Sequence, residues 1–181
     1  MRKYTLIGLF ALLAGVAAHH PSSTLAAGGG LDCSALVPTI TGSGVIHGTS
    51  GDDVIFGSPK ADTIYGGGGH DVICGGGGGD VIHGGSGNDD INGEAGRDRV
   101  YGDSGNDDVA GGADADVVSG GSGKDILHGT DANDTLYGGS GADLLLGGSG
   151  NDVSNGGSGK DTCIDADAGD TFVSCELFDV A

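Results

Sequence analysis

Aspartate recurs at every ninth residue over most of this chain, and this spacing is the sequence feature best suited to chemistry. Thirteen consecutive units keep the spacing without an insertion. These aspartates are Asp53, Asp62, Asp71, Asp80, Asp89, Asp98, Asp107, Asp116, Asp125, Asp134, Asp143, Asp152 and Asp161. Carboxylates are hard oxygen ligands for Ca²⁺, which takes about six to eight oxygens, so one nine-residue loop cannot fill its coordination shell. The pattern therefore indicates calcium sites that draw ligands from more than one loop.

Glycine and an aliphatic residue hold fixed places around each aspartate. A glycine stands five residues before every one of them, from Gly48 to Gly156, and an aliphatic residue stands two residues after eleven of them, which gives the unit G-x-x-G-x-D-x-U-x. Glycines at positions one, two and four of a unit allow a loop with positive φ. The residues expected to point inward are Ile55, Ile64, Ile73, Ile82, Ile91, Val100, Val109, Val118, Leu127, Leu136 and Leu145. Ser154 and Cys163 then take this slot, so the core should weaken toward the C-terminal end.

The composition points away from a conventional globular core. The chain of 181 residues holds 42 glycines, only 4% aromatic residues and no tryptophan, which leaves little bulky side chain to bury. Lys and Arg number 7 against 26 Asp and Glu, so a compact state would repel itself unless cations lay among the carboxylates. The same charge makes nucleic acid an unsuitable partner.

The unit resembles the haemolysin-type (RTX) nonapeptide calcium-binding repeat over residues 48–164, about two-thirds of the chain. The resemblance implies an all-β fold, a right-handed parallel β-roll (β-solenoid) in which two nine-residue units make one coil. Loops two units apart then stack on one edge at about 4.8 Å per coil. Asp53 would lie beneath Asp71, and Asp62 beneath Asp80 on the other edge. Thirteen loops in two rows form eleven stacked pairs, which limits the chain to about 11 Ca²⁺ ions.

The candidate metal ligands are the side chains of all thirteen repeat aspartates together with backbone carbonyls of the loops. The carbonyls expected to contribute are those of Gly66, Gly68, Gly75, Gly77, Gly84, Ser86, Gly120, Ser122, Gly138, Ser140, Gly147 and Ser149. Lys60, Asp114 and Ala132 replace glycine at position four, and weaker or reshaped sites are expected there. The alternative role for the aspartates is a turn in which each side chain bonds its own loop backbone. Because glycine loops lose much chain entropy on folding, calcium should supply much of the folding free energy.

Four cysteines in an exported chain suggest two disulfides, and no C-x-x-C pair supports a zinc site. In the roll that the resemblance implies, Cys74 and Cys163 lie five coils apart, about 24 Å, which exceeds the roughly 7 Å that a disulfide spans. Cys33 and Cys163 are separated in the same way. The expected pairs are therefore Cys33–Cys74 and Cys163–Cys175, each fastening a cap.

The N-terminal residues have the pattern of an export signal. Arg2 and Lys3 precede an apolar stretch, and small residues follow near Ala27. The stretch of about 15 residues is shorter than the roughly 20 that span a membrane, so no span is expected after signal cleavage. We expect a signal peptide at 1–27, an N-terminal cap at 28–47, RTX-type repeats at 48–164 and a C-terminal cap at 165–181. The protein should be secreted and extracellular.

No sequence motif indicates catalysis, because no G-x-S-x-G, H-E-x-x-H or P-loop pattern occurs. The favoured function is extracellular calcium binding by a stand-alone protein that folds after export. The alternatives are an adhesin or matrix-binding module, or a fragment of a larger RTX toxin or protease. A cell-surface or matrix partner would have an outer face to bind, since position nine of alternate units aligns Tyr65, His83, Tyr101, Ser119, Tyr137 and Asn155. Ordinary β-propensity is the simpler reason for tyrosine there.

Overall fold

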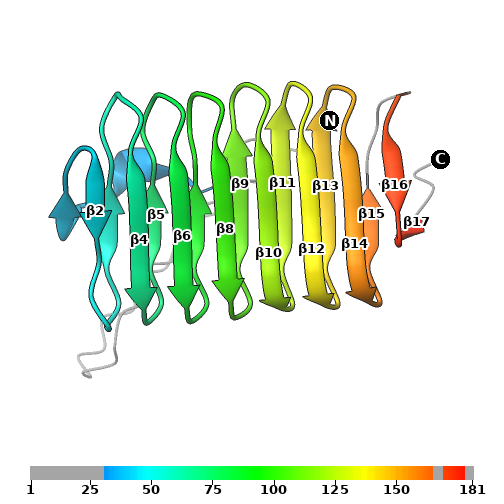
Figure 1. The fold of residues 1–181 in the computed structure, drawn as a ribbon, viewed down its shortest axis with the longest axis horizontal. Helices are drawn as coiled ribbons and strands as arrows, with labels where there is room; N and C mark the ends of the chain where they lie inside the picture. The colour runs from blue at the N-terminus through cyan, green and yellow to red at the C-terminus, as the bar shows by residue number, and fades with distance from the viewer. Residues whose placement is uncertain (1–30, 165–168, 178–181) are drawn as a thin grey trace, which may run out of the picture.

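The structure is a computed structural model that describes residues 31–164 and 169–177. Its strands form two parallel sheets, one of nine strands in the order β1-β3-β5-β7-β9-β11-β13-β15-β17 and one of eight in the order β16-β14-β12-β10-β8-β6-β4-β2. Consecutive strands alternate between the sheets, so the chain winds as a β-solenoid (Figure 1). The predicted signal peptide lies outside the described residues. The expected all-β roll is confirmed.

The elements are short, as expected for a nine-residue unit. The nine-stranded sheet holds β1 (Ile40–Thr41), β3 (Val54–Phe56), β5 (Val72–Cys74), β7 (Asp90–Asn92), β9 (Asp108–Gly112), β11 (Ile126–Asp131), β13 (Leu144–Ser149), β15 (Thr162–Ile164) and β17 (Glu176–Leu177). The eight-stranded sheet holds β2 (Val45–His47), β4 (Thr63–Gly68), β6 (Val81–Ser86), β8 (Arg99–Ser104), β10 (Val117–Gly123), β12 (Thr135–Gly141), β14 (Val153–Gly159) and β16 (Thr171–Val173). A 3₁₀ turn, η1 (Cys33–Ala35), precedes them.

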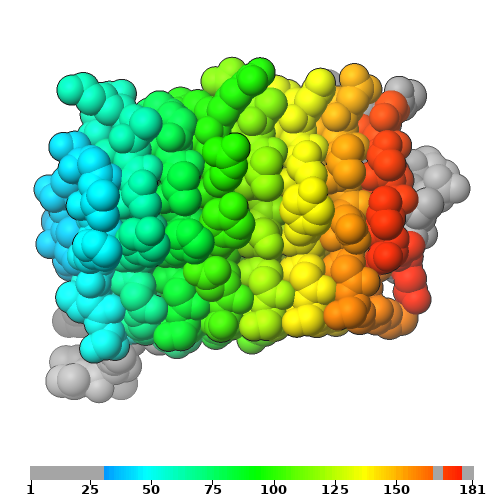
Figure 2. Space-filling model, in the orientation of Figure 1, coloured from blue at the N-terminus to red at the C-terminus, as the bar shows by residue number. Residues whose placement is uncertain are grey.

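The register between coils is two repeat units, as the resemblance to the RTX repeat implies. Ile64 is paired with Ile82, and Val118 with Leu136, so equivalent side chains stack directly along the roll. The two end coils are shorter than two units, because Ile40 is paired with Ile55 and Cys163 with Leu177. In the space-filling view the coils appear as successive bands along the long axis (Figure 2).

The core is one column of aliphatic side chains between the two sheets. All eleven predicted inward residues are at most 1% exposed, and Ile46 of the degenerate first unit joins them. At the C-terminal end Cys163 continues the column, with Phe172 and Cys175 packed against it. Ser154 is also buried in this slot, and its Oγ has no hydrogen-bond partner among the described residues. The predicted weakening of the core toward this end is confirmed.

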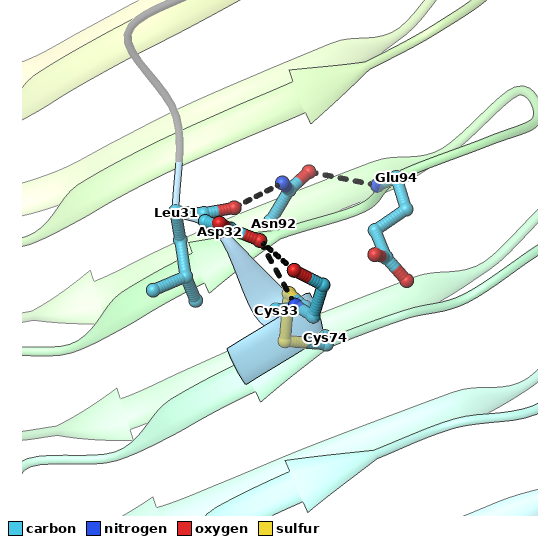
Figure 3. The surroundings of a disulfide bond; sticks show 7 residues. Leu31, Asp32, Cys33, Cys74, Asn92 and Glu94 are labelled. Carbon is cyan, nitrogen blue, oxygen red and sulfur yellow. Dashed lines mark hydrogen bonds between the residues drawn. A yellow bond between two sulfur atoms is a disulfide. The ribbon is translucent and has the colours of Figure 1, made fainter. Parts of the chain in front are cut away.

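Both expected disulfides are present. Cys33–Cys74 joins Cα atoms 6.2 Å apart, and Cys163–Cys175 joins Cα atoms 5.6 Å apart. Cys74 follows the inward Ile73 on β5, so it lies on the outer face of the sheet. Leu31, Cys33, Val72 and Cys74 form a small apolar cluster separate from the main core. The first disulfide therefore fastens the N-terminal segment against the side of the nine-stranded sheet (Figure 3).

We expect Ser154→Ala to stabilise the protein by about 1 kcal/mol, because it removes a buried hydroxyl that has no partner. Leu136→Ala, at the same slot one coil earlier, should instead destabilise it by about 2–5 kcal/mol by opening a cavity. Thermal unfolding in calcium measures both changes. A lower melting temperature for Ser154→Ala would show that its hydroxyl is satisfied.

Candidate metal-binding loops

All thirteen repeat aspartates are buried, and they form two rows. The Asp53 row comprises Asp53, Asp71, Asp89, Asp107, Asp125, Asp143 and Asp161. The Asp62 row comprises Asp62, Asp80, Asp98, Asp116, Asp134 and Asp152. In each row the Oδ1 atom of one aspartate accepts a hydrogen bond from the backbone N–H of the aspartate one coil earlier, at 2.7–3.1 Å. This bond joins all eleven predicted stacked pairs.

The second carboxylate oxygen is left open in most of these loops. Within the described part of the chain, Oδ2 is buried without a hydrogen-bond partner in Asp71, Asp80, Asp89, Asp98, Asp107, Asp116, Asp125, Asp134, Asp143 and Asp161. A buried polar atom without a partner costs roughly 1–3 kcal/mol, and an ionised one costs more. Ten such atoms at equivalent positions are not accidental defects. They are carboxylate oxygens that line the loops, and their chemistry fits the hard-ligand set that Ca²⁺ requires.

Glycine at position one makes room for these oxygens. A Cβ atom added to Gly66 would collide with the carbonyl oxygen of Gly84 in the next coil, and it would also collide with or crowd Oδ2 of Asp71. The same two kinds of oxygen face Gly102 and Gly129. A loop carboxylate and a carbonyl from the next coil therefore converge on one space.

The positions that need positive φ are two and four. Gly67 and Gly69 have φ of 108° and 111°, whereas Gly66 at position one has no positive φ. The sequence-based account of position one was therefore incomplete, since close approach rather than backbone conformation requires glycine there. Of the predicted carbonyl ligands, those at position one, such as Gly84 and Gly147, lie beside the carboxylates. The position-three carbonyls of Ser86 and Ser122 accept hydrogen bonds from the preceding coil.

The first loop of each row differs from the rest. Thr49 N–H donates to Oδ2 of Asp53, and Ser58 N–H donates to Oδ2 of Asp62, each at 2.7 Å. This is the alternative in which the aspartate bonds its own loop, and it accounts for two of the thirteen loops. Neither Thr49 nor Ser58 has the positive φ that turns this N–H away in later loops. These two loops are the least prepared for a cation.

Several residues other than glycine adopt the loop conformation. Asp114 and Ala132, at position four, have φ of 74° and 79°, whereas Lys60 does not. The expected reshaping therefore holds for the Lys60 loop, while the other two keep the common backbone. Glu94, Asp103 and Thr130 also have positive φ, at position two. The sequence analysis did not single out these three, although the loss of glycine at a regular position was the available signal.

Burial changes the acidity of the aspartate rows. It raises the pKa of Asp107, Asp116 and Asp134 to about 7, against the lowering effect of their Oδ1 hydrogen bonds, and nearby aspartates raise it further. At Asp62 burial also acts to raise the pKa, but hydrogen bonds from Gly44 and Ser58 outweigh it and hold the pKa below its usual value. Bringing these carboxylates together in the ionised form thus needs compensating positive charge.

The predicted outer face is present, and the rings toward its N-terminal end are stacked on one another. His47 and Tyr65 lie 5.1 Å apart between ring centroids, Tyr65 and His83 5.3 Å, and His83 and Tyr101 4.7 Å, with interplanar angles of 9–12°. The faces of Tyr65 and His83 are therefore covered by their neighbours. His47 is the member of this ladder that the sequence analysis did not include.

Within the described residues, no three His, Cys, Asp or Glu side chains are arranged to hold a metal ion, so a cation would have to use backbone carbonyls as well. Over the same residues no helix is long and apolar enough to cross a membrane.

Comparison with protein families identifies the repeat. The RTX calcium-binding nonapeptide repeat (4 copies) family matches residues 47–82, 75–109, 83–118, 101–131 and 128–163. The chain belongs to this family. The RTX roll is a structural calcium-binding fold, and the stacked aspartates of this chain fit calcium binding. Comparison with curated proteins gave no significant match.

The raised pKa values predict an unusual pH dependence for the calcium-free protein. Unfolded aspartate has a pKa near 3.9, whereas three row members have a folded pKa of about 7. The folded state therefore binds protons more tightly, and this stabilisation is complete below about pH 4 and lost as the pH rises through about 7. Without calcium, the β signal in far-UV circular dichroism should therefore be strongest near pH 4 and fall as the pH rises through about 7, where the calcium-free protein loses its fold. An increase would contradict the buried, unpartnered state of these carboxylates.

Proposed function

We propose that this protein is a secreted calcium-binding protein whose RTX roll folds as its loops take up calcium outside the cell. The observation that supports this most strongly is the row of buried Oδ2 atoms without hydrogen-bond partners. The thirteen aspartates and the loop carbonyls named above would hold the ions, and the eleven stacked pairs limit them to about 11. Bound Ca²⁺ would supply positive charge between neighbouring coils.

Dependence of folding on calcium follows from charge and from chain entropy. The chain has a formal charge of −19, and loss of residues 1–27 would remove two basic residues and no acidic one. Each coil adds one further carboxylate to each of the two buried rows, beside others of the same sign. Forty-two glycines add entropy to the unfolded chain without adding apolar surface to the core. Cation binding would offset both costs.

An extracellular location agrees with this coupling. Extracellular calcium modules bind at roughly 10⁻⁴ to 10⁻³ M, so the roll would stay unfolded in a calcium-poor cytoplasm. The two disulfides also fit an oxidising compartment. The proposed organisation is a signal peptide at 1–27, caps at 28–47 and 165–181, and the roll at 48–164.

Far-UV circular dichroism during a calcium titration tests the proposal. We expect a cooperative gain of β signal near millimolar calcium, with magnesium giving none at the same concentration.

Asp107→Asn should lower the free energy of unfolding at millimolar calcium by about 1–3 kcal/mol, because it keeps an acceptor for the backbone N–H of Asp89 while removing the charged oxygen.

Asp108→Asn is the matched control for that variant. Asp108 is the next residue in the chain, but its carboxylate lies 3.4 Å from Nε2 of His128 rather than in a loop. It should leave the calcium midpoint unchanged. If calcium produced no folding transition, or if both variants behaved alike, the proposed role of the Asp53 row would be wrong.

A further inference from the structure

Glu94 is an acidic residue at a loop position that usually holds glycine. It lies at position two of the unit at residues 93–98, and its φ of 71° matches the backbone of the glycine loops. An L-residue in this region costs roughly 1–2 kcal/mol. Gly76 and Gly112 occupy the equivalent positions one coil before and after it. Glu94 therefore carries a conformational cost that Gly76 and Gly112 avoid.

The glutamate side chain is directed along the roll toward the preceding coil. A Cβ atom at the equivalent Gly76 would approach the carbonyl oxygen of Ser58, one coil earlier, to 2.6 Å. In agreement, the Glu94 carboxylate accepts a hydrogen bond from the N–H of Gly76. The preceding loop consists of five consecutive glycines, residues 75–79, and so has no side chains in the way. An open hollow of about 470 Å³ lies there, lined in part by Glu94, Gly76 and Gly77.

Other oxygens meet one residue earlier in the same two loops, at Gly75 and Gly93. Asp80 is fully buried, and its Oδ2 has no hydrogen-bond partner among the described residues. A Cβ added to Gly75 would lie 2.7 Å from that Oδ2 and 2.6 Å from the carbonyl oxygen of Gly93, the residue before Glu94. Burial and the negative charge of Asp80 both raise the pKa of Glu94, while the Gly76 hydrogen bond lowers it. Two carboxylates thus act on one another without a cationic partner in the described structure.

The backbone of Glu94 is also held in place. Its N–H donates to Oδ1 of Asn92 at 2.9 Å, and Nδ2 of Asn92 donates to the carbonyl oxygen of Leu31 at 2.8 Å (Figure 3). Leu31 belongs to the N-terminal segment that the Cys33–Cys74 disulfide fastens to the sheet. The glutamate carboxylate points away from the Asn92 amide in this view. The N-terminal segment, through Asn92, therefore holds the backbone of Glu94 in place from outside the loop.

We propose that the carboxylate of Glu94 is a direct ligand of the divalent cation held between loops 75–80 and 93–98, and that this site is the tightest in the roll. The proposal rests on the proposed calcium-binding function and adds one ligand that the repeat does not supply. Calcium affinity rises with the number of charged ligands and with the rigidity of the site. Here Glu94 adds a charged ligand to that of Asp80, and the segment fastened by the disulfide makes the site more rigid.

The other acidic residue at position two does not have this arrangement. Asp103 has the same φ of 71°, but its Oδ2 lies 3.0 Å from Nδ1 of His83 on the outer face. That carboxylate already has a polar partner on the outer face. Thr130, the third residue other than glycine that has positive φ at this position, carries no charge. Of the three residues with positive φ at position two that are not glycine, only Glu94 brings a carboxylate that does not pair with a histidine.

Calorimetric calcium titration of the protein and its Glu94→Gln variant tests the proposal. The variant keeps the size and hydrogen-bonding ability of the side chain and removes its charge. We expect the Kd of the tightest class of sites to rise about tenfold or more, since even changes outside the ligand shell cost roughly 10–100-fold. Glu176→Gln is the matched control, because Glu176 is the only other glutamate and pairs with Lys160 at the surface.

A second measurement does not depend on the variant folding normally. With only two glutamates, protein labelled with ¹³C at the glutamate carboxyl carbon gives two resonances, those of Glu94 and Glu176. When substoichiometric Tb³⁺ is added to the calcium-saturated protein, the Glu94 resonance should broaden first. Equal broadening of both, or an unchanged tight class in Glu94→Gln, would overturn the role of Glu94 while leaving calcium binding intact. A wild-type protein that binds no calcium would instead refute the proposed function.

Discussion

The structure depends on the carboxylate that each coil places beneath its neighbour. One oxygen of this group accepts a hydrogen bond from the backbone of the preceding coil, and in ten loops the other is buried with no partner among the residues that the structure describes. The first oxygen holds the coils in register. The second leaves an uncompensated cost that grows with every coil added. A fold built in this way is incomplete as protein alone, because its own polar groups do not satisfy one another.

The rest of the architecture makes this arrangement possible with very little side-chain mass. One aliphatic residue per unit fills the space between the sheets, and glycine at position one lets carbonyl and carboxylate oxygens approach the same space. Glycine at positions two and four turns the loop without strain. The column of isoleucine, valine and leucine therefore sets the spacing of the sheets, while the loops set the spacing of the charges. A larger or smaller side chain in the aliphatic column would therefore also shift the loops.

The two rows of loops are not equivalent. In the Asp53 row most loops keep glycine at positions two and four, with Asp103 the main exception. In the Asp62 row Glu94, Asp114, Thr130 and Ala132 all adopt positive φ at some cost. Both disulfides lie toward the ends of the roll, where the end coils are shorter than two repeat units. The Asp53 row keeps the repeat pattern most closely, whereas most departures from the repeat pattern lie in the Asp62 row.

The sequence by itself determined the periodic features. The nine-residue spacing was sufficient to predict the inward column. The resemblance of the unit to the RTX repeat implied the two-unit coil and therefore the eleven aspartate pairs, since every unit meets the same neighbours one coil away. Given the roll, the disulfide pairs followed as well, because distance along the roll excludes the others. Only the tertiary structure showed that the Cys33 segment lies along the side of the sheet, that His47 completes a ring ladder, and that the glutamate of one loop reaches over an all-glycine loop. These features arise from single residues at non-periodic positions, and their contacts depend on which side chains happen to be absent one coil away.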